Sequence, residues 1–105
     1  MTQQEIASYV VSVVAVWSNR DKSQFTAATS LTTDLNLNSV RLRTMTGALR
    51  NFIQMERPSS TLLVREVKQA KKLGPLVALV IERRTGSANV NEGRQATLIS
   101  NAISN

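Results

Sequence analysis

The chain has 105 residues, 42% of them hydrophobic, and a formal net charge of +6, with no cysteine and no histidine. This length fits one domain with one modest core, while the missing residue types exclude disulfides, thiolate metal ligands, and the commonest general base and metal ligand. Because no convergent set of carboxylates, lysines or serines is present, we expect no catalytic site, no metal site and no enzyme.

The first predicted element is a helix from about residue 4 to residue 18. Glu5 lies in its first turn, where the helix dipole favours an acidic side chain. The segment is rich in valine, which also favours strands, but its apolar residues recur at helical spacing. These residues are Ile6, Val10, Val13, Val14 and Trp17. We interpret Trp17 as an anchor in the core.

A long connection follows over residues 19–38. Its many serines and threonines resist regular structure because they bond to their own backbone. A loop of this length is unusual in a compact domain and needs a reason. We expect four apolar side chains to hold it against the core: Phe25, Leu31, Leu35 and Leu37.

The second predicted helix starts at Asn38 or Ser39, either of which is a suitable N-cap. Ser39 therefore lies at the positive end of a helix dipole, where a bound or attached phosphate is stabilised. Gly47 lowers helix propensity by roughly 1 kcal/mol relative to alanine, either to admit another backbone or because it is tolerated. The apolar face comprises Leu42, Met45, Leu49, Phe52 and Ile53.

Two further helices are predicted after Arg57-Pro58. The third begins with a cap at Ser59, Ser60 or Thr61 and runs to about Lys72, with Leu63, Val64, Val67 and Ala70 on its apolar side. The fourth has Pro75 at its first position, which proline tolerates, and continues through a nearly all-apolar run. The predicted fold class is all-α. The predicted core is Ile6, Val10, Val14, Leu31, Leu35, Leu42, Leu49, Phe52, Val67, Leu76 and Val80.

From Thr85 the composition changes to glycine, serine, asparagine and threonine. Gly86-Ser87-Ala88-Asn89 is typical of a turn or linker. The apolar residues Ala96, Ile99 and Ile103 indicate at most a transient helix. We therefore predict a helical domain over residues 1–85 and a flexible polar tail over residues 86–105.

The stretch Asp34-Leu35-Asn36-Leu37-Asn38-Ser39-Val40 resembles the Asp-Leu-Gly-x-Asp-Ser-Leu signature of acyl and peptidyl carrier proteins. The similarity extends more loosely from Glu5 to Arg84 through the order of the elements, and residues 72–80 resemble the start of the family's last helix. The resemblance implies a four-helix carrier-protein-like bundle with a long first loop. It also implies a 4′-phosphopantetheine arm on Ser39 that carries a thioester-linked group.

The chain departs from this family in its charge. Most acyl carrier proteins are strongly acidic, whereas residues 41–84 hold ten Lys/Arg against three Glu, a net charge of +7. We expect the partner-binding surface to comprise Val40, Arg41, Arg43 and Arg50. The expected partners are a phosphopantetheinyl transferase and acyl-transferring enzymes that present acidic or neutral docking surfaces.

Two alternatives remain open. The first is a small basic helical nucleic-acid-binding or packaging protein, although no aromatic residues are interleaved to stack on bases. Its phosphate contacts would be Arg41, Arg43, Arg50, Arg57, Arg65, Lys68, Lys71 and Lys72. The second is a carrier-fold module that binds proteins without an arm. No segment approaches the ~20 apolar residues of a membrane span, and Met1-Thr2-Gln3-Gln4-Glu5 lacks the basic start of a secretory signal, so we expect a cytoplasmic protein.

Overall fold

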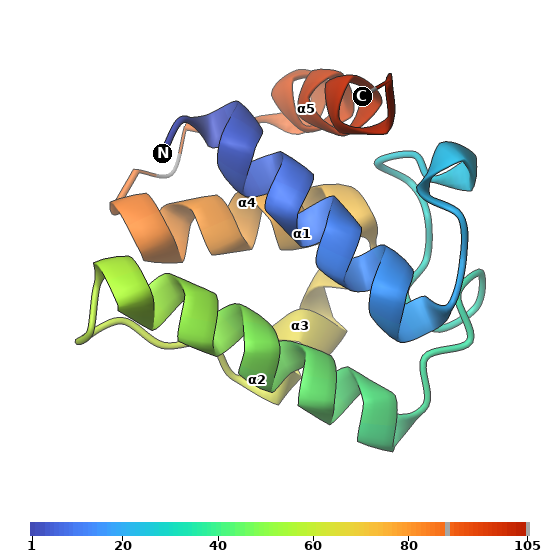
Figure 1. Cartoon of the computed structure of the whole chain (residues 1–105), viewed down its shortest axis with the longest axis horizontal. Helices are drawn as coiled ribbons and strands as arrows, with labels where there is room; N and C mark the ends of the chain where they lie inside the picture. The colour runs from blue at the N-terminus through green and yellow to red at the C-terminus, as the bar shows by residue number, and fades with distance from the viewer. Residues whose placement is uncertain (88, 105) are drawn as a thin grey trace.

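The computed structural model of the chain describes residues 1–87 and 89–104. This part of the chain forms five α-helices and a short 3-10 helix, and it contains no strand (Figure 1), which confirms the all-α class. In chain order the elements are α1 (Gln3–Ser18), η1 (Lys22–Gln24), α2 (Ser39–Glu56), α3 (Val64–Ala70), α4 (Leu73–Thr85) and α5 (Glu92–Ser104).

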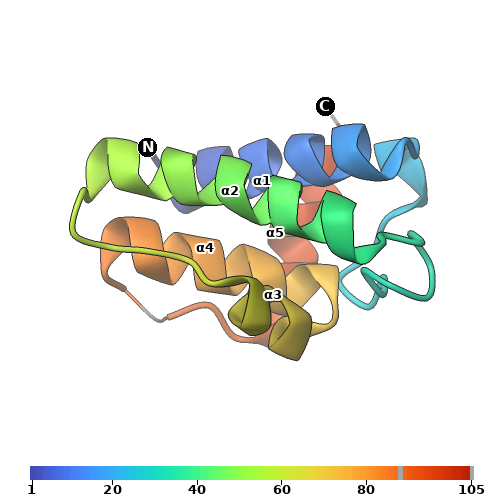
Figure 2. The ribbon, with the colours of Figure 1, turned by 90° about the horizontal axis from the view of Figure 1, so that it is seen from below.

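Helix α1 lies at the centre of the packing. It contacts α2, α4 and α5, and α2 and α4 also contact each other (Figures 1 and 2). A capping box starts α1: the Glu5 N–H donates to the Thr2 hydroxyl over 3.1 Å, and the Thr2 N–H donates to the Glu5 carboxylate over 2.8 Å. Every residue of the predicted core is buried, because each helix buries its apolar stripe against its neighbours.

The long connection between α1 and α2 is held against the start of α4. Its four predicted apolar plugs, Phe25, Leu31, Leu35 and Leu37, are all buried. The first two N–H groups of α4, from Leu73 and Gly74, donate to the carbonyls of Thr29 and Ala27 over 2.9 Å each. The N-cap of α4, Lys72, makes no side-chain cap. The loop therefore satisfies orphan donors that the helix itself cannot pair.

Helices α3 and α4 differ from their predicted bounds. Helix α3 is shorter than expected at both ends: its N-cap is Leu63, not Ser59, Ser60 or Thr61, and it ends at Ala70 because the chain leaves helical geometry at Lys71, which has a φ of 66°. In the segment before it Leu62 is buried and Leu63 is 36% exposed, so the predicted stripe begins one residue too late. Helix α4 begins at Leu73, two residues before Pro75, a position that proline tolerates because first-turn N–H groups have no intrahelical partner.

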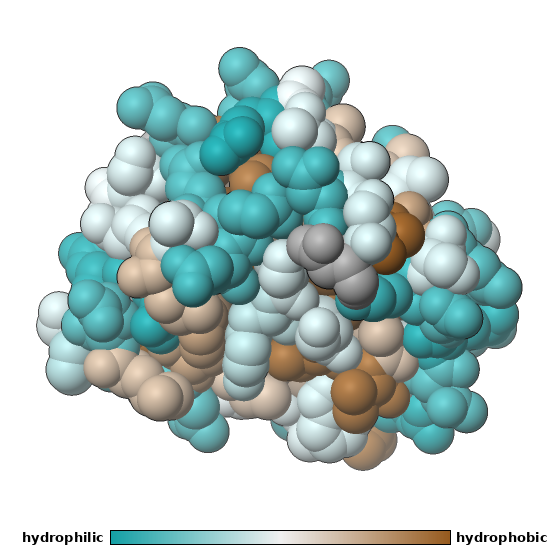
Figure 3. All heavy atoms as spheres, turned by 45° about the horizontal axis from the view of Figure 1, so that its top comes forward, coloured by the Kyte–Doolittle hydropathy of each residue, from teal (hydrophilic) through white to brown (hydrophobic). Residues whose placement is uncertain are grey.

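The C-terminal segment also differs from the predicted flexible tail. Residues 92–104 form α5, which buries Leu98, Ile99 and Ala102, and the Gln4 side-chain amide of α1 donates to the Leu98 carbonyl over 2.8 Å. The other side of α5, which faces forward in Figure 3, is largely hydrophilic. A helix this short is marginal alone, and it gains stability by packing on α1. Ala88 of the predicted linker and Asn105 lie outside the described residues.

Two arginines of α4 connect the helices. The Arg83 guanidinium pairs with both carboxylate oxygens of Glu66 in α3 and holds the pKa of that carboxyl below its usual value. Arg84 is buried, donates to the carbonyl of Phe52 in α2, and lies 4.1 Å from the centre of the Phe52 ring. Tyr9 of α1 stacks on the same ring at 3.9 Å. These contacts join α1, α2, α3 and α4.

Candidate functional site

Ser39 is the first residue of α2 and its side chain is exposed. The N-cap is Asn38, whose side-chain oxygen accepts the N–H of Arg41 over 2.9 Å. Among the described residues the Ser39 hydroxyl has no hydrogen-bond partner. Leu37, two residues before Ser39, is buried and donates its N–H to the Leu31 carbonyl over 3.3 Å. The hydroxyl is therefore held outside the core, and no hydrogen bond ties it to the described part of the chain.

The N–H groups around Ser39 suit an anion. In an α-helix the first N–H groups have no intrahelical acceptor. Here the Asn38 side chain accepts the N–H of Arg41, and the Asn38 carbonyl accepts the N–H of Leu42. The N–H groups of Ser39 and Val40 have no acceptor within the described residues. Together with the helix dipole, these two donors stabilise negative charge at the hydroxyl.

The four residues of the predicted partner surface have different roles. Val40 is 68% exposed beside Ser39. Arg41 is exposed, but it donates to the Trp17 carbonyl over 3.0 Å, where a cation suits the C-terminal end of α1. Arg50 is half-buried and donates to the Leu62 carbonyl over 2.8 Å. Arg43 is exposed and has no ion pair or hydrogen bond from its side chain to the described residues. Arg43 is thus the cation of this group most available to a partner.

The larger basic set divides in the same way. Besides Arg41 and Arg50, Arg57 has a contact within the chain, a hydrogen bond to the Arg83 carbonyl over 3.4 Å. Within the described part of the chain, the five remaining cations are exposed and their side chains form no hydrogen bond or ion pair; they are Arg43, Arg65, Lys68, Lys71 and Lys72. Four of these five lie on α3 or directly after it.

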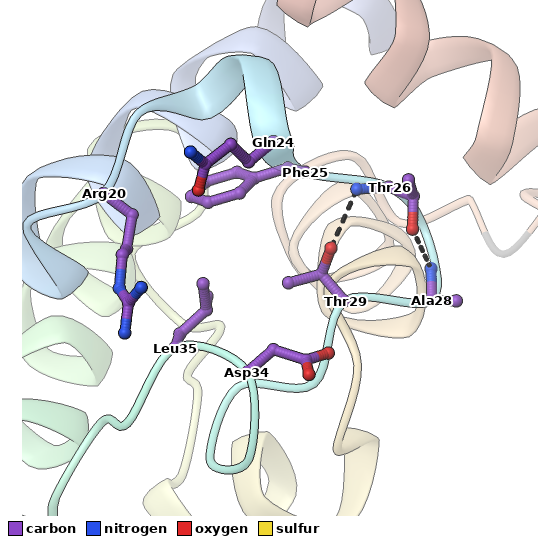
Figure 4. A pocket seen from close by; sticks show the side chains of 8 residues that line it. All are labelled: Arg20, Gln24, Phe25, Thr26, Ala28, Thr29, Asp34 and Leu35. Atoms are coloured by element: carbon purple, nitrogen blue, oxygen red, sulfur yellow. Dashed lines mark hydrogen bonds between the residues drawn. The ribbon is translucent and has the colours of Figure 1, made fainter.

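A pocket of about 360 Å³ lies beside the loop that leads to Ser39 (Figure 4). Phe25 and Leu35 form buried parts of its wall, and Arg20 borders it from the end of α1. The Asp34 carboxylate, also on its wall, accepts the Ser30 N–H over 2.7 Å. Residues Leu35 and Ser39 are four apart, so their Cα atoms lie within ~14 Å of each other. Sequence reasoning missed this pocket because a folded loop, with no recurrent pattern, encloses it.

Within residues 1–87 and 89–104 no three metal-ligating side chains lie together as a metal site requires. In the same part of the chain, no helix is both long and apolar enough to cross a membrane. Comparisons of the chain with known protein families, curated proteins and solved structures give no match.

Proposed function

We propose that the chain is an acyl carrier-like protein that holds a thioester-linked group on a 4′-phosphopantetheine arm at Ser39. The observation that carries this proposal is the state of the Ser39 hydroxyl. It is exposed at the first residue of α2 and makes no hydrogen bond within the described residues, while Asn38 caps the helix. A serine kept for structure at this end would cap the helix itself.

The order of the elements supports the same proposal. The sequence α1, long loop, α2, short α3 and α4 follows the order that the carrier resemblance implies, and α5 is then an addition to the four-helix bundle. The two N–H groups of Ser39 and Val40 would face the phosphodiester of the arm, and the dipole of α2 would favour its charge. In this proposal the chain itself performs no catalysis. The proposal also includes a cytoplasmic location for the protein.

The partners of this carrier need docking surfaces unlike those that meet acidic carriers. Val40 and Arg43 are exposed on α2 next to the attachment point. A basic partner surface would be repelled there, and an acidic or neutral one would be accepted. We therefore propose that the phosphopantetheinyl transferase and the acyl-transferring enzymes present acidic or neutral docking surfaces to this protein.

The test is incubation with coenzyme A and a broad-specificity phosphopantetheinyl transferase, followed by intact-mass measurement. We expect a mass gain of one arm that is lost in Ser39→Ala and kept in Ser59→Ala, a matched control at another exposed serine. Ser39→Ala should change the free energy of unfolding by less than ~0.5 kcal/mol, because the exposed hydroxyl makes no hydrogen bond to the described residues. Asn38→Ala should cost about 1 kcal/mol. No mass gain with several transferases, from a folded sample, would contradict the proposal and leave a carrier-fold module without an arm.

A second candidate function is nucleic-acid binding. The observation that favours it is the group of five exposed cations without partners in the described chain, Arg43, Arg65, Lys68, Lys71 and Lys72. Lysine and arginine side chains that neutralise backbone phosphates supply essentially all of non-specific nucleic-acid binding. Arg41, Arg50 and Arg57 are weaker candidates for phosphate contacts, because each already donates to a carbonyl of the chain.

A further inference from the structure

Arg84 is a buried cation whose charge the chain itself compensates only loosely. The residue is 8% exposed, and arginine is rarely buried to this extent unless it is paired. The carboxylate of Glu56 lies 3.9 Å from its Nη2, and the Glu56 side chain is 65% exposed, so the pair is too long for a hydrogen bond. The carbonyl and the ring of Phe52 hold the guanidinium in place, but neither of them cancels its charge.

Arg84 lines a pocket of about 270 Å³ where α2 and α4 end. In Figures 1 and 2 the C-terminal ends of these two helices lie on the same side of the molecule as the N-terminus. Arg57, the C-cap of α2, is the second arginine of the lining. The other lining residues are Met1, Ile6, Glu56 and Thr85. The pocket is therefore lined by two guanidinium groups and one carboxylate.

Both arginines keep donors for a ligand. A guanidinium has five N–H donors, and here each Nη1 donates to a carbonyl, that of Arg83 for Arg57 and that of Phe52 for Arg84. Their other nitrogens form no hydrogen bond within the described residues. Gly86 leaves room for Arg57, because a Cβ there would lie 3.0 Å from Nη1. The bonds to the carbonyls order the donors before a ligand arrives, which lowers the cost of binding.

We propose that this pocket binds the phosphate group of a small ligand, whose oxygens accept N–H groups from Arg57 and Arg84. A phosphate monoester has a charge of about −1.5 to −2 at pH 7 and three acceptor oxygens, so it can bridge two guanidinium groups, whose planar forks match phosphate oxygens. The volume lies near the lower limit of ~300 Å³ for small-molecule sites, which fits a compact ligand. Ser39 begins the same helix roughly 25 Å away, so this site is independent of the proposed arm.

The test is a titration with inorganic phosphate and with phenyl phosphate at low salt and pH 7, followed through the NMR signals of the arginine Nε–H groups. We expect both ligands to shift the signals of Arg57 and Arg84. The signal of Arg20, an exposed arginine after α1, should not shift. Tighter binding of phenyl phosphate would identify an organic phosphate as the ligand, and binding of inorganic phosphate at least as tight would identify the free anion. Either result supports the site.

Two substitutions should change the affinity in opposite directions. Arg57→Gln should weaken phosphate binding roughly tenfold, the effect of losing a hydrogen bond between charged groups, while Arg20→Gln removes the same charge and should not. Glu56→Gln removes the carboxylate that competes for Arg84 and should strengthen binding several-fold. Glu82→Gln, at an exposed glutamate of α4 that does not line the pocket, should leave the affinity unchanged. Arg84 is observed and not replaced, because its contacts join α2 and α4.

Three results would overturn the inference. One is no shift of the Arg84 Nε–H signal with either phosphate ligand. Another is equal weakening by Arg57→Gln and Arg20→Gln, which would mean that the net charge of the chain attracts phosphate and this pocket does not. The third is unchanged or weaker binding in a folded Glu56→Gln variant, because the contact between Glu56 and Arg84 would then be an ion pair that no ligand displaces. None of these measurements involves Ser39, so failure of the pocket and failure of the arm are observed separately.

Discussion

At the scale of single residues, Lys71 carries the clearest backbone strain. Its φ is 66° and its ψ is −38°, and the N–H of Lys72 donates to the Ala70 carbonyl over 2.7 Å, which closes a strained γ-turn around Lys71. The turn is held because the Lys71 carbonyl accepts the Leu31 N–H over 2.9 Å. The contact fastens the loop that leads to Ser39, so the strain serves to position that loop.

We expect Lys71→Gly to raise the free energy of unfolding by about 1 kcal/mol. Glycine adopts a positive φ without the steric penalty that lysine has, and this gain should exceed the cost of glycine's extra entropy in the unfolded chain. Lys72→Gly is the matched control. Lys72 has a φ of −121°, so the same change there should lower stability. Urea denaturation measures both, and a loss of stability in Lys71→Gly would show that its side chain, and not its backbone, matters at this position.

At the scale of elements, α5 decides whether the C-terminal segment belongs to the domain. Leu98 is fully buried and its carbonyl accepts the Gln4 amide of α1. Leu98→Ala should therefore cost roughly 2–5 kcal/mol in the free energy of unfolding, the range for a buried leucine. Thr97→Ala, at the exposed neighbour, should change it far less. If both substitutions have negligible effects, residues 92–104 form a flexible tail, as composition alone indicates.

At the scale of the whole molecule, the uneven charge separates the two candidate functions. If the five exposed cations Arg43, Arg65, Lys68, Lys71 and Lys72 all contact phosphates of duplex DNA, the logarithm of the association constant should fall against that of the salt concentration with a slope of roughly −4 to −5. Replacing Lys68 by glutamine should make this slope shallower by about one. A titration with duplex DNA or RNA that shows no binding at low salt would remove the nucleic-acid function.

Much of the fold and part of the candidate site could be predicted from the sequence. Helical spacing of apolar residues located α1 and α2, because a stripe such as Leu42, Met45 and Leu49 has only one compact solution, burial on a single face. Short polar residues placed the start of α2 at Asn38 and Ser39, because capping is a local interaction. The exposure of Ser39 followed from the same local rule.

Only the tertiary structure decided which side chains meet across the chain. It showed that Arg41, Arg50, Arg57, Arg83 and Arg84 bond to groups on other segments, while the Arg43 side chain forms no such bond within the described residues. It distinguished Gly74, which is packed, from Gly47, which is open, and it placed α5 on α1. These outcomes depend on which faces come together, and that choice is made by summed burial and pairing over distant segments. Residue spacing within one segment does not contain that information, so the sequence by itself determined the helices and their inner faces, and packing determined the surface that a partner meets.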